Sequence, residues 1–226
     1  MPASLPLSVY QSPLACNEDA RVAVKTERLD AEDREGIRRA AQLLREGAIV
    51  AFPTDTVYGL GVRADDAAAV AELARLKRRP EGKEFACLVP DAAAARAWGR
   101  FDEGADALVK AFWPGALTIV VPGRGGSGTI GLRCPDCRVT REMLALVGVP
   151  VAAPSANAPG APPARNAEDL LAEFDGRIGA VLDGGAARIG LPSTVVRIAA
   201  GGLEVLREGA IRAEALAAVL GECGRL

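Results

Sequence analysis

The 226-residue sequence contains no histidine. Its absence excludes Ser-His-Asp and Cys-His nucleophile systems, imidazole metal sites and a pH switch based on an ordinary imidazole. Any chemistry must therefore use lysine, arginine, carboxylates, hydroxyl groups, cysteine or backbone groups. Lysine is also scarce, because the 27 basic residues include only Lys25, Lys77, Lys83 and Lys110 besides arginine, so the position of each lysine is informative.

A secreted disulfide framework and a membrane span are missing as well. The five cysteines are scattered and odd in number, which favours a reducing compartment. No run approaches the ~20 apolar residues that cross a bilayer, and the first residues lack a basic region followed by a sustained apolar stretch. The net charge of -2 gives no overall field that attracts nucleic acid, although a local basic patch is compatible with it. These features predict a cytoplasmic protein without a membrane partner.

Hydrophobic periodicity divides the chain into a short extension and one α/β domain. Residues 1–25 are rich in proline and serine and are predicted to be a mobile N-terminal extension, whereas residues 26–226 form the domain. Helical segments alternate with short β-branched runs, which indicates a sheet with helices packed on it. Helices are predicted at 30–47, 66–79, 91–98, 103–112, 139–147, 167–174 and in a last segment through 220. Strands are predicted at 48–52, 85–89, 117–121, 149–153 and 180–185, with a strand-like run up to 133 and a hairpin of 193–198 with 203–209.

Two of these strands end in proline and then present polar side chains. The strand at 48–52 is followed by Pro53 and a segment that contains Thr54, Asp55, Thr56 and Tyr58. Polar residues beyond the carboxyl end of a strand lie where open α/β sheets bind ligands. Turns in which these side chains bond their own backbone are an alternative.

The second such strand, at 149–153, ends at Pro154 and presents Ser155 and Asn157. A hydroxyl and an amide at this spacing can hold phosphate oxygens together with nearby backbone N–H groups. An ordinary Asx or Ser turn explains the same pattern equally well.

Cations gather around the predicted helix end near residue 79. Lys77, Arg78, Arg79 and Lys83 could clamp a polyphosphate, with arginine as a bidentate fork and lysine as a point charge. The alternative is that they complement the helix dipole and cap its carbonyl groups. Arg133, at the end of its strand, could anchor a carboxylate or lie on the surface.

The Cys134-Pro-Asp-Cys137 stretch resembles half of a zinc site. No histidine can complete it, and the other three cysteines would have to converge on it, so metal binding by protein side chains is not predicted. A redox dithiol is also disfavoured, because the motif follows a strand-like segment and does not open an obvious helix. The prediction is two thiols in a turn.

Seven short motifs occur in a fixed order along the chain: PTDTVYGLG, K-x-R-P with a nearby lysine, FWPGALTIVV, IGLR, APSAN, STVV and LREGAI. Together they resemble the YrdC/Sua5 family of L-threonylcarbamoyladenylate synthases over about residues 30–213. The resemblance implies a single α/β domain in which a YrdC-like twisted mixed sheet, flanked by helices, surrounds a basic cavity. It also implies the short form of the family, because no long second domain follows the last motif.

The activity that the resemblance implies is that of a nucleotidyltransferase. It would join L-threonine, bicarbonate and ATP into threonylcarbamoyl-AMP and pyrophosphate, and the product would feed the t6A modification of tRNA. Mg²⁺ would be bound with ATP, and no tightly bound prosthetic group is expected. The downstream partner would be the tRNA threonylcarbamoyltransferase machinery, and contact with tRNA or double-stranded RNA is a further expectation. A threonine carbamate already carries an anionic oxygen, so its attack on the α-phosphate needs positioning and charge neutralisation more than a strong base.

The matched motifs also imply site residues. The catalytic signature would consist of Lys77, Arg79, Ser155 and Asn157. ATP would be surrounded by these four residues together with Lys83, Thr129 and Arg207. Threonine would contact Thr56, Arg133, Ser193 and the backbone of Ala153. The residues that shape the pocket would be Thr54, Tyr58 and Thr194.

Four positions depart from the family pattern. Leu88 stands where many members carry a histidine near threonine, Glu84 follows Lys83 where proline is usual, Pro163 replaces a common serine and Pro192 replaces a glutamate. The segments EFACLV, LPST and LREG lean toward the YciO-like branch of the superfamily. The alternatives are therefore a YciO-like paralogue that binds a nucleotide or RNA without chemistry, or an enzyme that acts on a different small carboxylate. The intact four-residue signature favours the synthase.

Overall fold

A computed structural model describes residues 25–79, 84–126, 128–158, 160–199 and 202–222. Residues 1–24, which carry most of the predicted extension, lie outside these ranges. The described elements follow one another as β1 (Glu27–Asp30), α1 (Arg34–Arg45), β2 (Val50–Phe52), β3 (Gly59–Arg63), α2 (Ala67–Leu76), β4 (Cys87–Leu88), α3 (Ala92–Trp98), α4 (Glu103–Phe112), β5 (Leu117–Pro122), β6 (Thr129–Arg133), α5 (Arg138–Val147), β7 (Val151–Ala152), α6 (Ala167–Phe174), β8 (Ala180–Asp183), β9 (Thr194–Ala199), β10 (Gly202–Arg207) and α7 (Ala213–Glu222).

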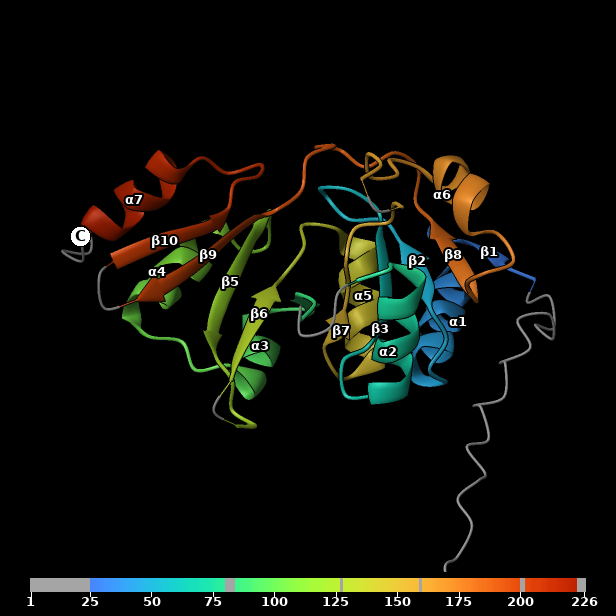
Figure 1. Ribbon diagram of the computed structural model, residues 1–226, viewed down its shortest axis with the longest axis horizontal. Coiled ribbons are helices and arrows are strands. Elements are labelled where there is room, and N and C mark those ends of the chain that lie inside the picture. Colours follow the sequence, from blue (N-terminus) through green and yellow to red (C-terminus); the bar gives the residue numbers. More distant parts are fainter. Residues whose placement is uncertain (1–24, 80–83, 127, 159, 200–201, 223–226) are drawn as a thin grey trace, which may run out of the picture.

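One ten-stranded mixed sheet connects these elements in the order β1-β8-β2-β3-β7-β4-β6-β5-β9-β10. Parallel pairs join β1 with β8, β8 with β2, β4 with β6 and β5 with β9, whereas the other neighbours run antiparallel. The β1–β8 end and the β9–β10 end lie at opposite ends of the elongated molecule (Figure 1). The predicted α/β fold with a mixed sheet flanked by helices is confirmed.

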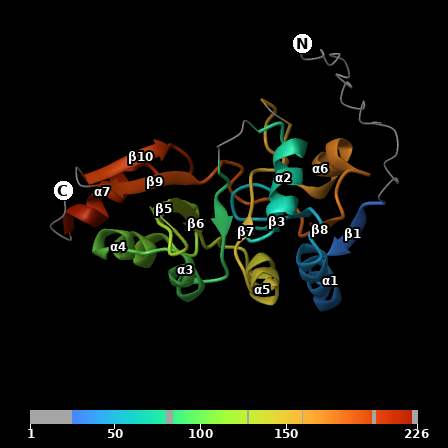
Figure 2. The ribbon, with the colours of Figure 1, turned by 60° about the horizontal axis from the view of Figure 1, so that its bottom comes forward.

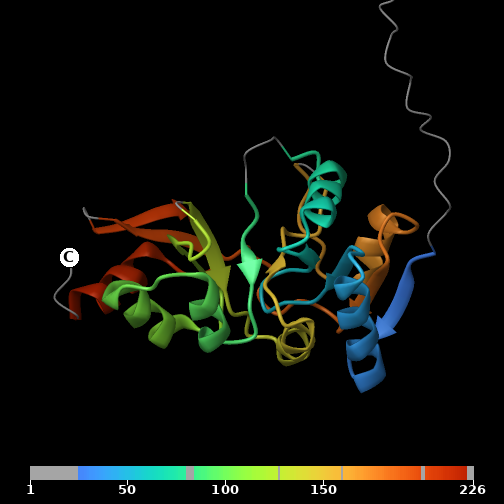
Figure 3. The same ribbon diagram turned by 90° about the horizontal axis from the view of Figure 1, so that it is seen from below.

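The helices cover the two faces of the sheet unequally. The helices α1, α5, α3 and α4 lie along one face (Figure 2), and α2 and α6 lie on the other face, over the half that contains β2, β3 and β8. The view from below shows the same arrangement, with the β5–β6–β9 half of the second face not covered by any described helix (Figure 3). This uncovered half leaves room for a site on the sheet itself.

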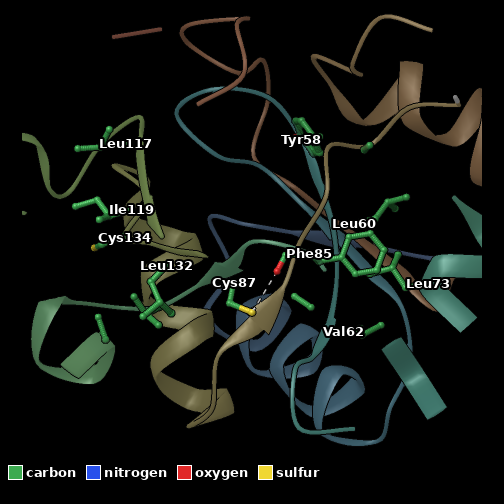
Figure 4. Packing of buried hydrophobic residues seen from close by; sticks show 14 of the residues in the cluster. Tyr58, Leu60, Val62, Leu73, Phe85, Cys87, Leu117, Ile119, Leu132 and Cys134 are labelled. Carbon is green, nitrogen blue, oxygen red and sulfur yellow. Dashed lines mark hydrogen bonds between the residues drawn. The ribbon is translucent and has the colours of Figure 1, made fainter. Parts of the chain in front are cut away.

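A continuous buried cluster joins the two halves of the sheet. Leu117 and Leu132 lie on one side of it and Leu60 and Leu73 on the other, with Cys87 near the middle (Figure 4). The four leucines have no exposed surface, and burying each side chain contributes roughly 1.5–3 kcal/mol before entropic costs. The shared core supports the single-domain interpretation.

Two strands were missed by the sequence prediction. The first three residues of β1 were assigned to no element, and its last residue, Asp30, was taken as the N-cap of the first helix. The cap is instead Asp33, whose carboxylate accepts a hydrogen bond from the Glu35 N–H. β3 contains two glycines and resembles a turn. Gly61 is needed there because an added Cβ would lie 2.4 Å from Cε1 of Phe52.

The Cys134–Cys137 stretch leads directly into α5, which begins one residue before the helix start predicted at residue 139. Cys137 is the N-cap of α5, although its side chain makes no capping hydrogen bond. Cys134 is buried, and both cysteines are free thiols. Among the described residues, no three histidine, cysteine or carboxylate side chains gather in a way that could hold a metal ion. None of the described helices has both the length and the apolar character required to cross a membrane.

Candidate active site

A cavity of about 350 Å³ lies against the uncovered half of the sheet. Its floor is built from alternate residues of three strands, namely Thr118 and Val120 of β5, Gly131 and Arg133 of β6, and Val195 of β9. Successive side chains of a strand point to opposite faces. The residues between them therefore pack in the core on the helical side, which leaves polar and small side chains facing the cavity.

The facing wall comes from the two proline-ended strands that the sequence singled out. Residues 54 and 56–59 and residues 153–155 line the cavity. The backbone holds the two segments together, because the Ala156 N–H donates to the Tyr58 carbonyl at 2.8 Å and the Leu60 N–H donates to the Pro154 carbonyl at 3.0 Å. Segments almost a hundred residues apart in sequence thus form one wall.

Arg133 is the most constrained cation of the cavity. Its Nε donates to the Gly115 carbonyl at 2.9 Å, Nη1 to Thr56 Oγ1 at 2.9 Å and Nη2 to Asp55 Oδ1 at 2.5 Å. The Arg133 and Asp55 side chains are only 7% and 1% exposed. Burial lowers the pKa of Arg133, and the Asp55 carboxylate opposes this effect. A guanidinium has five N–H donors, so two have no partner among the described residues and can meet a ligand.

Two further arginines converge on the same cavity. Arg79 and Arg207 line it with Arg133, and Glu84 is the single acidic residue among the described lining residues. Burial lowers the pKa of Arg207, and repulsion from Arg79 lowers it further. Arg207 in turn contributes to the lowered pKa of Arg133. Three guanidinium groups around one cavity, of which Arg207 repels the other two, are suited to a ligand with several negative charges.

Arg79 is held at the rim by an aromatic ring and a carbonyl group. Its guanidinium lies 4.5 Å from the centroid of the Phe85 ring, and Nη2 donates to the Glu84 carbonyl at 2.5 Å. Burial lowers the pKa of Arg79. Stacking on a ring together with a carbonyl contact fixes the direction of a flexible side chain.

Hydroxyl groups also line the cavity. Ser193 Oγ and Thr118 Oγ1 are 2.9 Å apart, and Arg207 Nη2 donates to the Ser193 carbonyl at 2.8 Å and to Ser193 Oγ at 3.2 Å. Thr129 also lines the cavity. Thr118 was not among the predicted site residues. The sequence feature that could have identified it is that Thr118 is the one hydroxyl residue in the apolar run LTIVV and faces the opposite side of the strand from Leu117 and Ile119.

The segment that follows Pro53 lines the cavity and also forms a local turn, so both structures considered for it from the sequence are present. Thr54 Oγ1 donates to the Val57 carbonyl at 2.6 Å and accepts from the Thr56 and Val57 N–H groups, so it forms a local turn while it lines the cavity. The Tyr58 hydroxyl donates to the Gly185 carbonyl at 2.8 Å, and burial raises its pKa to about 12. Tyr58 therefore fixes the wall through its hydroxyl group.

Three predicted site residues that the structure describes do not line the cavity. Lys77 and Asn157 are described but do not line the cavity, and Lys77 contacts the Ser155–Asn157 loop instead. Thr194 is fully buried, and its hydroxyl donates to the Ile211 carbonyl at 2.6 Å and accepts from the Ile211 N–H at 3.0 Å. Thr194 thus fixes the chain before α7. The predicted ATP contact Lys83 lies outside the described residues.

Three of the four residues that depart from the family pattern line the cavity. Leu88, Glu84 and Pro192 line it, whereas Pro163 does not. Leu88 pairs in register with Arg133 on the neighbouring strand. An apolar side chain therefore stands beside the most buried cation of the site.

The sequence is similar to those of proteins named as threonylcarbamoyl-AMP synthases. A threonylcarbamoyl-AMP synthase of Bacillus subtilis is 38% identical over 206 residues, which are 87% of this chain and 59% of that protein. A putative threonylcarbamoyl-AMP synthase of Mycobacterium tuberculosis is 35% identical over 215 residues, which are 87% of this chain and 96% of the relative. The chain thus spans less than two thirds of the first relative and nearly all of the second.

A solved structure agrees with the sequence comparisons. The crystal structure of Pyrococcus abyssi Sua5 complexed with L-threonine superposes with a TM-score of 0.80 at 35% identity, covering 87% of this chain and 61% of that one. The Sua5/YciO/YrdC family model, described as telomere recombination, matches residues 42–209. Its match includes the cavity residues from Thr54 to Arg207. The chain belongs to the Sua5/YciO/YrdC family.

Proposed function

We propose that the chain is a threonylcarbamoyl-AMP synthase, which joins L-threonine, bicarbonate and ATP and releases pyrophosphate. The observation that carries the proposal is the convergence of Arg79, Arg133 and Arg207 on one hydroxyl-lined cavity. The relatives named for this activity support it, as does the structural similarity to a threonine-bound Sua5. The cavity volume of about 350 Å³ lies at the lower end of the range for small-molecule sites.

The threonine end of the site is assigned to the buried side of the cavity. The two remaining N–H donors of Arg133 would bind the threonine carboxylate. The hydroxyls of Thr56 and Ser193 line the same cavity and would bind the hydroxyl group of threonine. The backbone of Ala153 completes this end. Leu88, the register neighbour of Arg133, offers an apolar contact for the threonine methyl group.

The ATP end of the site is assigned to the rim. Arg79 and Arg207 would neutralise the phosphates, with Thr129 and Ser155 of the same cavity as further contacts, and Lys83 is proposed as a further cation. Mg²⁺ would enter as part of the ATP complex, since Glu84 is the one carboxylate that the described lining provides. Phosphate oxygens are the usual principal ligands of Mg²⁺ in such complexes.

The reaction can proceed without a strong general base. The threonine amino group and bicarbonate give a carbamate with loss of water. One carbamate oxygen then bonds to the α-phosphorus while the bond to the bridging oxygen breaks, and pyrophosphate leaves with that electron pair. The nucleophilic oxygen carries no proton, so the protein has to orient the reactants and stabilise charge on the transferring group. Arginine, which stays protonated, is suited to this role in a chain without histidine.

The partners follow from the product. Threonylcarbamoyl-AMP is a mixed anhydride that transfers its acyl group, and we propose that it serves the machinery that forms t6A in tRNA, in the cytoplasm. Direct contact with tRNA or double-stranded RNA is part of the same proposal. The proposal concerns the domain that this chain shares with its longer relatives.

The test is a pyrophosphate-release assay with ATP, Mg²⁺, bicarbonate and threonine. We expect release that depends on threonine and bicarbonate, together with calorimetric binding of threonine that ATP strengthens. RNA binding together with indifference to threonine, without turnover, would instead support a YciO-like binding protein. Turnover with another small carboxylate in place of threonine would reassign the substrate.

Substitution of Gly209 by alanine is expected to lower kcat/KM for threonine about tenfold to a hundredfold. An added Cβ would lie 2.4 Å from the Pro192 carbonyl oxygen and 2.5 Å from the Ser193 carbonyl carbon. The backbone must move, and a displacement of about 1 Å at a substrate contact has effects of this size. Gly125 is the matched control, because its added Cβ meets nothing within 4 Å. Equal kinetics for both variants would contradict the placement of Ser193 at the substrate.

A further inference from the structure

The ammonium group of Lys77 has its hydrogen-bonding capacity filled by one loop. Its Nζ donates to the Ser155 carbonyl at 2.8 Å, to Asn157 Oδ1 at 3.0 Å and to the Asn157 carbonyl. A lysine ammonium has three donors and no acceptor. A phosphate could bind this group only if one of these bonds broke.

These contacts also fix the orientation of the Asn157 amide. Its Nδ2 donates to the Ala161 carbonyl at 2.7 Å, so Oδ1 faces Lys77 on the other side. A reversed amide would direct N–H groups at the ammonium and an oxygen at a carbonyl oxygen, and both contacts would be repulsive. One orientation of Asn157 is therefore strongly favoured.

The Asn157 amide in turn fixes the proton of Ser155. Ser155 Oγ lies 2.8 Å from Asn157 Oδ1, which can only accept, so the serine hydroxyl must donate to it. Ser155 lines the cavity, whereas Asn157 is not among its lining residues. The hydroxyl proton is thus engaged by Asn157, and the lone pairs of Oγ are left for the ligand.

The loop is held rigidly around this arrangement. The Ala156 N–H donates to the Tyr58 carbonyl at 2.8 Å, and the Ala158 N–H donates to Glu173 Oε2 of α6 at 3.0 Å. Burial lowers the pKa of Lys77 to about 8, Glu173 opposes this, and Arg79 adds to it. Lys77, at the C-cap of α2, is thus a half-buried connection between that helix and the loop.

We propose that Lys77 and Asn157 are positioning residues that act through Ser155, whose hydroxyl oxygen they present to the nucleotide as an acceptor. This inference rests on the proposed function. It divides the four-residue signature in two: Arg79 and Ser155 meet the nucleotide, whereas Lys77 and Asn157 orient Ser155. An oxygen presented in this way accepts from an O–H or N–H group or approaches Mg²⁺, and it does not donate to a phosphate oxygen.

A double-mutant cycle tests the division. Lys77→Met, Ser155→Ala and the double variant are compared with the wild type by kcat/KM for ATP in pyrophosphate release, per folded protein. We expect each single variant to lose about 30-fold to 100-fold and the double variant to lose no more than threefold beyond Ser155→Ala. Independent contacts would give a combined loss near the product of the two. Lys110→Ala, an exposed lysine of α4, is the control for loss of a lysine.

Thermal unfolding of the same proteins separates orientation from simple stability. The decrease in Tm caused by Lys77→Met should be the same in both Ser155 backgrounds, while its kinetic effect disappears without the Ser155 hydroxyl. Asn157→Ala with Ser155→Ala repeats the cycle if Lys77→Met does not fold. Multiplicative losses in a cycle overturn the positioning role, and a wild-type protein without threonine-dependent release overturns the proposed function instead.

Discussion

Replacing Arg133 by methionine is expected to abolish threonine-dependent turnover and to lower the free energy of unfolding by about 3–5 kcal/mol. The substitution removes the donors proposed to bind the threonine carboxylate and leaves the Asp55 carboxylate, 1% exposed, without its 2.5 Å ion-pair partner. An uncompensated buried charge is among the largest single costs in a folded protein. Urea unfolding measures the stability, and calorimetry with threonine measures binding.

The double variant Asp55→Asn with Arg133→Met separates the two effects. Removal of both charges should recover most of the lost stability, and the asparagine oxygen can still accept the Asp136 N–H that Asp55 Oδ1 now accepts at 3.2 Å. Threonine binding should remain absent. Recovery of binding together with stability would show that Arg133 supports the fold and does not contact the substrate.

A surface ion pair provides the control for this experiment. Arg63 pairs with Asp65 at 2.7 Å, but the two side chains are 30% and 32% exposed. Arg63→Met should therefore change the stability by no more than about 1 kcal/mol. Its kinetics should match those of the wild type, because Arg63 does not line the cavity.

Local sequence pattern was sufficient to single out two of the segments that line the cavity. The two strands ended by Pro53 and Pro154 each deliver polar residues to the cavity, as expected for residues beyond the ends of strands. The family resemblance then selected Arg133, Arg207 and Ser193 from many similar residues, and the structure brings these three together. Neither argument required knowledge of the strand order.

The contacts between residues of the site could not be predicted in the same way. Arg133 and Asp55 are 78 residues apart in sequence, and Thr118 and Ser193 are 75 apart. Such contacts depend on which strands become neighbours, which local periodicity does not specify. Lys77 shows the limit most clearly, because a lysine two residues before an arginine has the same sequence pattern whether it faces a ligand or a backbone carbonyl.

Substitution of Arg79 by methionine is expected to lower kcat/KM for ATP by about 10²–10³-fold, the range found when one preorganised donor to a developing charge is removed. The Phe85 ring, 4.5 Å from the guanidinium, and the Glu84 carbonyl already direct Arg79 at the cavity, so no ordering cost arises when ATP binds. Methionine keeps the apolar contact with the ring but cannot neutralise phosphate. Initial rates of pyrophosphate release at varied ATP concentration provide the measurement.

Arg96 is a matched control for Arg79, because the chain holds it in a similar way outside the cavity. Its guanidinium lies 5.6 Å from the centroid of the Phe101 ring and pairs with Asp106 at 2.6 Å. Loss of an exposed arginine–phenylalanine stack should cost at most about 1 kcal/mol of stability, and Arg96→Met should leave kcat/KM unchanged. The deficit of Arg79→Met should also shrink as salt rises, since screening weakens the attraction of the wild-type cavity for ATP. A deficit that is independent of salt, or equal losses for the two variants, would mean that the charge of Arg79 does not act on the nucleotide.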